Sequence, residues 1–200
     1  MNKPIGTEAQ KLAKGAARYP DVPSTQDIIA TDKVAAPGWV CSESYEFLGD
    51  EDIATDRYTE AAYAEREFER LWTRTWQFAC REEHIPEVGD YHVYDIGRHS
   101  FIIARTGDNE VRAYYNACLH RGRKLCDHAG ERASVFRCPH HGWSWDLAAK
   151  RKDLTAEWDF PGIREEVSHL KQAQVALWGG FIFINPDPDA ISFEEYAGQE

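Results

Sequence analysis

Two short stretches of the sequence each combine a cysteine with a histidine and then a glycine. They read CLHRG at 118–122 and CPHHGW at 138–143. A thiol and an imidazole that stand two or three positions apart can be presented by a single loop as metal ligands. Both stretches also follow runs that favour strands, VRAYYN and SVFR. The spacing therefore predicts a metal site that two neighbouring loops share.

Two kinds of metal centre could use this ligand set. Four ligands would satisfy one tetrahedral zinc, although zinc sites usually pair cysteine with cysteine and histidine with histidine. A two-iron, two-sulfide cluster can take two cysteines on one iron and two histidines on the other, so each loop gives one ligand to each iron. Gly122 and Gly142 would let backbone N–H groups approach the sulfides. The mixed pairs favour the iron–sulfur cluster, and a zinc-stabilised binding module is the alternative.

The two stretches, together with L-C at 125–126, resemble a known family signature. It is the Rieske [2Fe–2S] signature of the α subunits of Rieske non-haem iron oxygenases, the aromatic ring-hydroxylating dioxygenases and related demethylases. The likeness extends through 68–105 and 178–188, and it covers residues 58–190.

The resemblance also implies which residues bind the cluster. Cys118 and Cys138 would bind one iron, and His120 and His141 would bind the other. The family commonly has tyrosine at the next position upstream of the second histidine, whereas this chain has His140 there. We assign His141 as the ligand because a glycine and a tryptophan follow it directly, and we expect His140 to lie beside the cluster or at the surface.

Composition limits the class of protein. The 200 residues carry a net charge of −11 with no run of Lys or Arg, which argues against a nucleic-acid partner. The longest apolar runs fall far short of the roughly 18 residues of a membrane span, and the N-terminus lacks the apolar core of a signal peptide. The five cysteines fit metal binding in a reducing compartment better than a disulfide framework. We therefore expect a cytoplasmic protein that makes no membrane contact.

The rest of the sequence must position the two loops. An apolar stripe over 59–75, with Thr59 as its N-cap, predicts a helix packed on the core. Runs of β-branched and aromatic residues between turn residues predict short antiparallel strands. These runs are 89–96, 100–106, 110–115, 174–178 and 181–185. We therefore expect a mainly β fold, a small antiparallel sandwich or barrel of the Rieske type with an N-terminal helix and arm.

Three regions follow from these patterns. Residues 1–57 show no sustained periodicity and are expected to form an N-terminal arm, and residues 58–190 form the Rieske domain. Ser192 and Glu195 make a capping box that predicts a helix within 191–200. We expect this last stretch to be the start of a truncated or missing C-terminal segment, so that the sequence is a fragment or a split product of something longer.

The resemblance implies one-electron transfer within an aromatic ring-hydroxylating or demethylating oxygenase α subunit. It implies a ferredoxin or reductase as electron donor, a mononuclear non-haem Fe(II) in a missing C-terminal domain, and a trimer-like homo-oligomeric ring at full length. The other histidines lack the spacing of an iron-binding facial triad, and Glu166 with His169 has no further partner, so we expect this chain alone to be inactive on substrate. The alternative is a free-standing Rieske ferredoxin that only carries electrons, against which the N-terminal extension argues.

Overall fold

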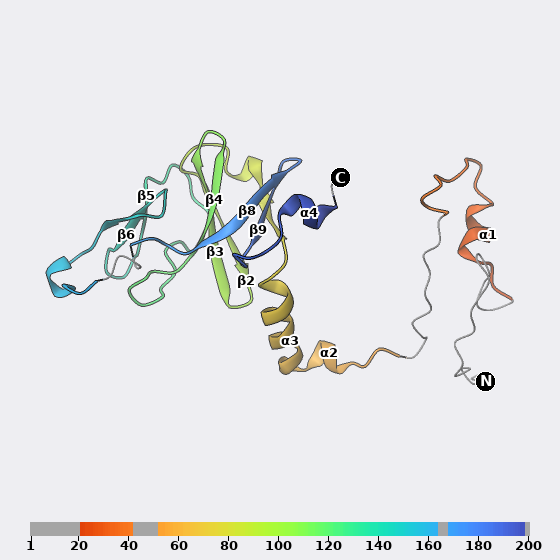
Figure 1. The fold of residues 1–200 in the computed structure, drawn as a ribbon, viewed down its shortest axis with the longest axis horizontal. Helices are drawn as coiled ribbons and strands as arrows, with labels where there is room; N and C mark the ends of the chain where they lie inside the picture. Colours follow the sequence, from red (N-terminus) through yellow and green to blue (C-terminus); the bar gives the residue numbers. More distant parts are fainter. Residues whose placement is uncertain (1–20, 42–51, 164–167, 199–200) are drawn as a thin grey trace. The chain divides into compact units, whose positions relative to one another are not determined.

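The chain divides into two compact units, Met1–Ala54 and Thr55–Glu200. Every strand in the residues that the structure describes belongs to the second unit (Figure 1). A computed structural model of the chain describes residues 21–41, 52–163 and 168–198.

The described part of the first unit holds one short helix, α1 (Thr25–Ile29). Ser24 caps it by accepting the Asp27 N–H, and the Asp27 carboxylate accepts the Ser24 N–H in return. The remainder of the expected N-terminal arm, at 1–20 and 42–51, lies outside the described residues.

The second unit is built on a six-stranded antiparallel sheet with the order β1-β9-β8-β4-β3-β2 (Figure 1). Its strands are β1 (Gln77–Arg81), β2 (Tyr91–Ile96), β3 (His99–Gly107), β4 (Glu110–Tyr115), β8 (Gln172–Trp178) and β9 (Phe181–Asn185). The edge strands β1 and β2 approach each other, so the sheet curls into a nearly closed barrel. The expected mainly β, antiparallel fold is therefore confirmed, and the five predicted strands match β2, β3, β4, β8 and β9.

A smaller sheet carries the second of the two cysteine–histidine stretches. Its three antiparallel strands are β5 (Val135–Arg137), β6 (Ser144–Asp146) and β7 (Arg151–Asp153). The turn between β5 and β6 holds the sequence CPHHGW. Between β6 and β7, Ala149 adopts a φ of +63°, a left-handed conformation that more often belongs to glycine. Its N–H donates to the Asp146 carbonyl oxygen at 2.9 Å, which closes the turn.

Two buried apolar clusters stabilise this unit. One fills the barrel, with fully buried isoleucines from β3 and β9. The other joins the barrel to the smaller sheet and includes Tyr114, Phe136 and Trp145 together with Cys118 and Cys138. Burying a large side chain of this kind contributes about 1.5–3 kcal/mol. The cysteines of both loops therefore belong to a packed core.

The segment before β1 differs from the single helix that the sequence predicts. It consists of α2 (Asp56–Thr59), α3 (Ala61–Glu67) and a π-helical turn, η1 (Phe68–Trp72). The predicted N-cap was wrong, because Thr59 is the last residue of α2. The helix is interrupted at Glu60, whose backbone is extended with a ψ of 125°.

The apolar stripe of this segment is only partly buried. Phe68 is buried, whereas Leu71 and Trp72 are 43% and 44% exposed. A π-helical turn places its hydrogen bonds five residues apart instead of four, so apolar positions spaced for an α-helix leave the buried face there.

The remaining elements are short. They are the 3₁₀ turns η2 (Glu82–His84) and η3 (Glu157–Asp159) and the helix α4 (Phe193–Ala197). Ser192 caps α4, because its side chain accepts the Glu195 N–H at 3.2 Å. This is one of the two hydrogen bonds of the predicted capping box. None of the helices in the described ranges is long and apolar enough to cross a membrane.

Candidate metal centre

The first ligand loop follows β4 and folds into a tight turn closed by backbone hydrogen bonds. The Gly122 N–H donates to the Cys118 carbonyl oxygen at 2.7 Å, and the Cys118 N–H donates to the Arg123 carbonyl oxygen at 2.8 Å. Gly122 has a φ of +75°, where a side chain would be strained. The turn directs the N–H groups of His120 and Arg121 at the Cys118 sulfur.

The second ligand loop repeats this backbone pattern at the turn of the β5–β6 hairpin. The Gly142 N–H donates to the Cys138 carbonyl oxygen at 3.0 Å, and the Cys138 N–H donates to the Trp143 carbonyl oxygen at 2.7 Å. Gly142 has a φ of +79°. The N–H groups of His140 and His141 are directed at the Cys138 sulfur. Each loop therefore surrounds one cysteine sulfur with backbone donors.

The loops bring the two thiols close enough for each to shift the pKa of the other. Burial raises the pKa of the Cys118 thiol, and the neighbouring Cys138 raises it further. At Cys138 burial acts in the same direction, but the N–H groups of His140 and His141, the Cys118 thiol and the charge of Arg123 outweigh it and hold the pKa below its usual value. Donors that favour a thiolate at a buried sulfur suit a metal ligand.

The His120 ring lies in an aromatic environment. It stacks on Trp143 with centroids 4.8 Å and planes 14° apart, and Phe160 meets it edge-on at 5.7 Å. The His141 ring stands 4.7 Å from it. The Nδ1 atom of His120 is buried and has no hydrogen-bond partner among the residues described. Because an unpaired buried polar atom is costly, this nitrogen indicates a bound group at the centre.

His141 is the histidine of the second loop that faces the first loop. The His140 and His141 rings stack at 3.9 Å, and both side chains are exposed, but it is the His141 ring that contacts His120. Desolvation, followed by the charges of His140, His120 and Arg121, lowers the pKa of His141. A lowered pKa favours the neutral imidazole that binds metals. The arrangement supports the choice of His141, which stays a prediction.

The donors fit a two-iron cluster in kind and in grouping. Within the described part of the chain, no three Cys, His, Asp or Glu side chains converge as one metal ion would require. The four candidates instead meet in pairs, thiol beside thiol and ring beside ring. In a cluster of this type each iron takes only two protein ligands, because bridging sulfides complete its coordination.

A cleft of about 400 Å³ opens beside His120. Leu119 and Trp143 form one part of its wall, and Phe160, Pro161 and Ile163 form another. The sequence motif contains Trp143 but gives no indication of Phe160, which reaches His120 from the segment after η3. The segment that carries Phe160 therefore forms an apolar wall beside His120, and this wall was not predicted from the sequence.

The comparisons with known proteins place this centre in a family context. A family model described as the Rieske [2Fe-2S] domain matches residues 75–162, which include all four ligand candidates. Biphenyl 2,3-dioxygenase subunit alpha of Rhodococcus jostii (strain RHA1) is 32% identical over 82% of this chain and 36% of its own length. The anthranilate 1,2-dioxygenase large subunit of Acinetobacter baylyi (strain ATCC 33305 / BD413 / ADP1) is 35% identical over 73% of this chain and 31% of its own length.

A similar fold is present in a solved structure. A crystal structure of a quaternary ammonium Rieske monooxygenase in complex with L-carnitine aligns with a TM-score of 0.65 at 27% identity. The alignment covers 70% of this chain and 40% of that one. The chain thus spans about a third of the length of the curated relatives it matches.

Proposed function

Because the chain carries a Rieske [2Fe–2S] domain homologous to the N-terminal region of aromatic ring-hydroxylating dioxygenase α subunits, we propose that it transfers single electrons through a [2Fe–2S] cluster. Cys118 and Cys138 bind one iron, and His120 and His141 bind the other. The observation that carries the proposal is the pairing of like donors by two equivalent loops, beside a buried His120 Nδ1 that has no hydrogen-bond partner in the described part of the chain.

The chemistry of the donors fits electron acceptance at moderate potential. Two thiolates and two neutral imidazoles bring two negative charges, whereas four thiolates would bring four. When bound, such a cluster supplies a one-electron couple at about −150 to +300 mV, against about −400 mV for plant-type ferredoxins. The backbone N–H groups around Cys118 and Cys138 stabilise negative charge on the sulfurs.

The two histidines present different surfaces to a partner. Trp143 and Phe160 pack around His120, whereas the His141 side chain is exposed. The His120 side of the centre is thus lined by an apolar cleft, whereas the His141 side faces solvent. We therefore place the contact with an electron-transfer partner on the His141 side.

The finer role follows from the homology to α subunits. We propose that a ferredoxin or a reductase donates the electron, and that a mononuclear non-haem iron in a C-terminal domain of a longer α subunit accepts it. We also propose that the longer protein oxygenates an aromatic compound as a homo-oligomer in the cytoplasm. The support is the similarity to the biphenyl and anthranilate dioxygenase subunits, of which this chain spans about a third.

The test is the metal content and the EPR spectrum of the purified chain. We expect two irons and two acid-labile sulfides per chain, a red-brown colour that dithionite bleaches, and a Rieske-type EPR signal in the reduced state. One zinc per chain with a silent spectrum would contradict the proposal and support the zinc-stabilised module.

A pair of cysteine variants provides the matched control. Cys118 and Cys80 are both almost fully buried, at 3% and 2% exposure, but Cys80 lies in β1 in the barrel core. We expect Cys118→Ser to lose the iron and Cys80→Ser to keep it. Equal iron loss from both variants would mean that burial, and not ligation, explains the effect.

A further inference from the structure

Asn116 directly follows β4 and precedes Cys118 by two positions. Its side chain is 2% exposed and makes four hydrogen bonds inside the protein. The Oδ1 atom accepts the N–H of Leu125 at 2.9 Å and of Cys126 at 3.0 Å. The Nδ2 atom donates to the Cys126 carbonyl oxygen at 2.6 Å and to Ser100 Oγ at 3.0 Å. A carboxamide has two donors and two acceptor positions, so its capacity is fully used.

These bonds join the two ends of the first ligand loop. Asn116 stands before the loop, and Leu125 and Cys126 stand after it. Ser100 belongs to β3, and its carbonyl oxygen also accepts the Asn116 N–H at 2.8 Å. One side chain therefore ties the start of the loop, its end and the barrel wall together.

The second ligand loop is closed in a different way. Its ends are β5 and β6, which are paired strands, with Arg137 opposite Ser144. Arg137 also donates to the Gly142 carbonyl oxygen and forms an ion pair with Asp153, both at 2.9 Å. The two side chains of that pair are 52% and 56% exposed, so the pair contributes little. Strand pairing joins the ends of the second loop, whereas the Asn116 side chain joins the ends of the first.

We propose that Asn116 is a positioning residue for the cluster. It acts through Cys118 and His120, whose placement opposite the second loop it fixes, and not as a ligand. This inference rests on the proposed function, because it concerns how the chain holds the [2Fe–2S] cluster. Buried polar residues that orient metal ligands in this way change metal retention when they are replaced.

The main variant is Asn116→Ala in the complete 200-residue chain. It leaves the N–H groups of Leu125 and Cys126 buried without an acceptor and frees the end of the loop. We expect the cluster to be lost to an iron chelator roughly 10- to 100-fold faster than from the wild-type chain. We also expect altered g values in the reduced-state EPR spectrum, which a general loss of stability would not produce.

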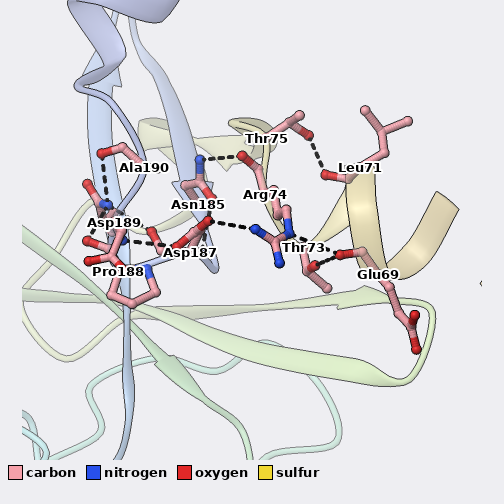
Figure 2. Close-up of polar contacts among 11 residues, drawn as sticks. Glu69, Leu71, Thr73, Arg74, Thr75, Asn185, Asp187, Pro188, Asp189 and Ala190 are labelled. Carbon is pink, nitrogen blue, oxygen red and sulfur yellow. Dashed lines mark hydrogen bonds and ion pairs between the residues drawn. The ribbon is translucent and has the colours of Figure 1, made fainter. Parts of the chain in front are cut away.

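Asn185 provides the matched control. It is 1% exposed, lies at the end of β9 and belongs to neither ligand loop. Figure 2 shows its bonds: Nδ2 donates to the Arg74 carbonyl oxygen at 3.3 Å, and Oδ1 accepts the Asp187 N–H at 3.0 Å. We expect Asn185→Ala to lower the melting temperature but to keep wild-type g values and, below that temperature, the wild-type rate of cluster loss.

Asn116→Asp keeps the shape of the side chain and the acceptors for Leu125 and Cys126, but it loses the amide donors. We expect this variant to fold and to lose its cluster at a rate between those of the wild-type chain and Asn116→Ala. If Asn116→Ala does not fold, the aspartate variant decides alone. If Asn116→Asp shows wild-type g values and loses its cluster to the chelator at the wild-type rate, the positioning role is overturned.

The two hypotheses fail in different ways. A wild-type chain without iron and sulfide would overturn the proposed function itself. A wild-type chain with a cluster, together with Asn116 variants whose spectra and cluster-loss rates match those of Asn185→Ala, would overturn only the role of Asn116.

Discussion

The adjacent histidines of the second loop differ in what their rings contact, and this difference predicts which one binds iron. The His141 ring lies 4.7 Å from the His120 ring, whereas the His140 ring stacks on His141 at 3.9 Å. We expect His141→Ala to lose the cluster, because an iron then lacks a donor and the loop lacks an anchor. We expect His140→Tyr to keep it. Iron content and the visible absorption spectrum measure both outcomes.

The opposite pattern would reverse the ligand assignment. If His140→Tyr loses the iron while His141→Ala retains it, the nitrogen that binds iron belongs to His140. His128 provides a control, because it is an exposed histidine outside both ligand loops. His128→Ala should keep a full complement of iron.

The two cysteine–histidine loops could be recognised from the sequence because each pair stands within a few residues, while the assignment of the four ligands rests on the family resemblance and stays a prediction. The supporting side chains could not. Asn116 bonds to residues nine and ten positions away, and nothing in the sequence indicates that the loop returns to meet it. Phe160 reaches His120 across an even longer separation. Contacts of this kind depend on tertiary packing, which local patterns do not specify.

At the level of the loops, the two glycines with left-handed backbone predict unequal effects of an added methyl group. A Cβ at Gly142 would lie 2.9 Å from Thr155 Oγ1, whereas a Cβ at Gly122 meets nothing within 4 Å. Gly122→Ala should lower the free energy of unfolding by about 1–2 kcal/mol through backbone strain alone. Gly142→Ala should lower it by more, because Thr155 must also move. Denaturant unfolding of the iron-loaded chain gives both values.

Removing the clash separates its cost from the backbone strain. Thr155 is exposed, so Thr155→Ala should have a small effect by itself. In that background, the costs of Gly142→Ala and Gly122→Ala should become similar. A persistent difference between them would show that something other than Thr155 restricts the second loop.

The elements themselves were predictable to different degrees. Five of the six barrel strands are runs of β-branched or aromatic residues between turn residues, and they were recognised close to their true limits. The sixth, β1 (Gln77–Arg81), was not predicted. The strands β5, β6 and β7 have three residues each, too few to establish a period of two. The apolar stripe over 59–75 wrongly predicted a single helix. The interruption at Glu60 and the π-helical turn of η1 change the face that each side chain occupies.

At the scale of the whole molecule, the division of the chain into two compact units predicts that the second unit, Thr55–Glu200, folds and binds iron without the first. Both buried apolar clusters and both ligand loops lie within residues 55–200. A fragment of those residues should contain two irons and melt close to the temperature of the complete chain. Thermal unfolding and iron analysis measure this. A fragment that aggregates or holds no iron would show that residues 1–54 contribute to the fold of the metal centre.

The complete chain is also predicted to accept electrons without oxidising a substrate. Oxygen activation at a non-haem iron needs two histidines and a carboxylate on one metal, with open positions beside them. Among the residues that the structure describes, no three such side chains converge. The sequence pattern of Glu166 and His169 offers no third ligand, and Glu166 lies outside the described residues.

The experiment supplies the chain with a reductase, NADH and a panel of aromatic acids, and it measures hydroxylated product together with oxygen uptake. We expect the cluster to be reduced and then slowly reoxidised by oxygen, with no product. His141→Ala, which should lack the cluster, gives the background of oxygen uptake by the reductase alone. Because that background contains no cluster, any excess uptake in the wild-type chain reports leakage from the cluster. Sustained product from the wild-type chain would instead require a second metal site, formed with residues outside those described.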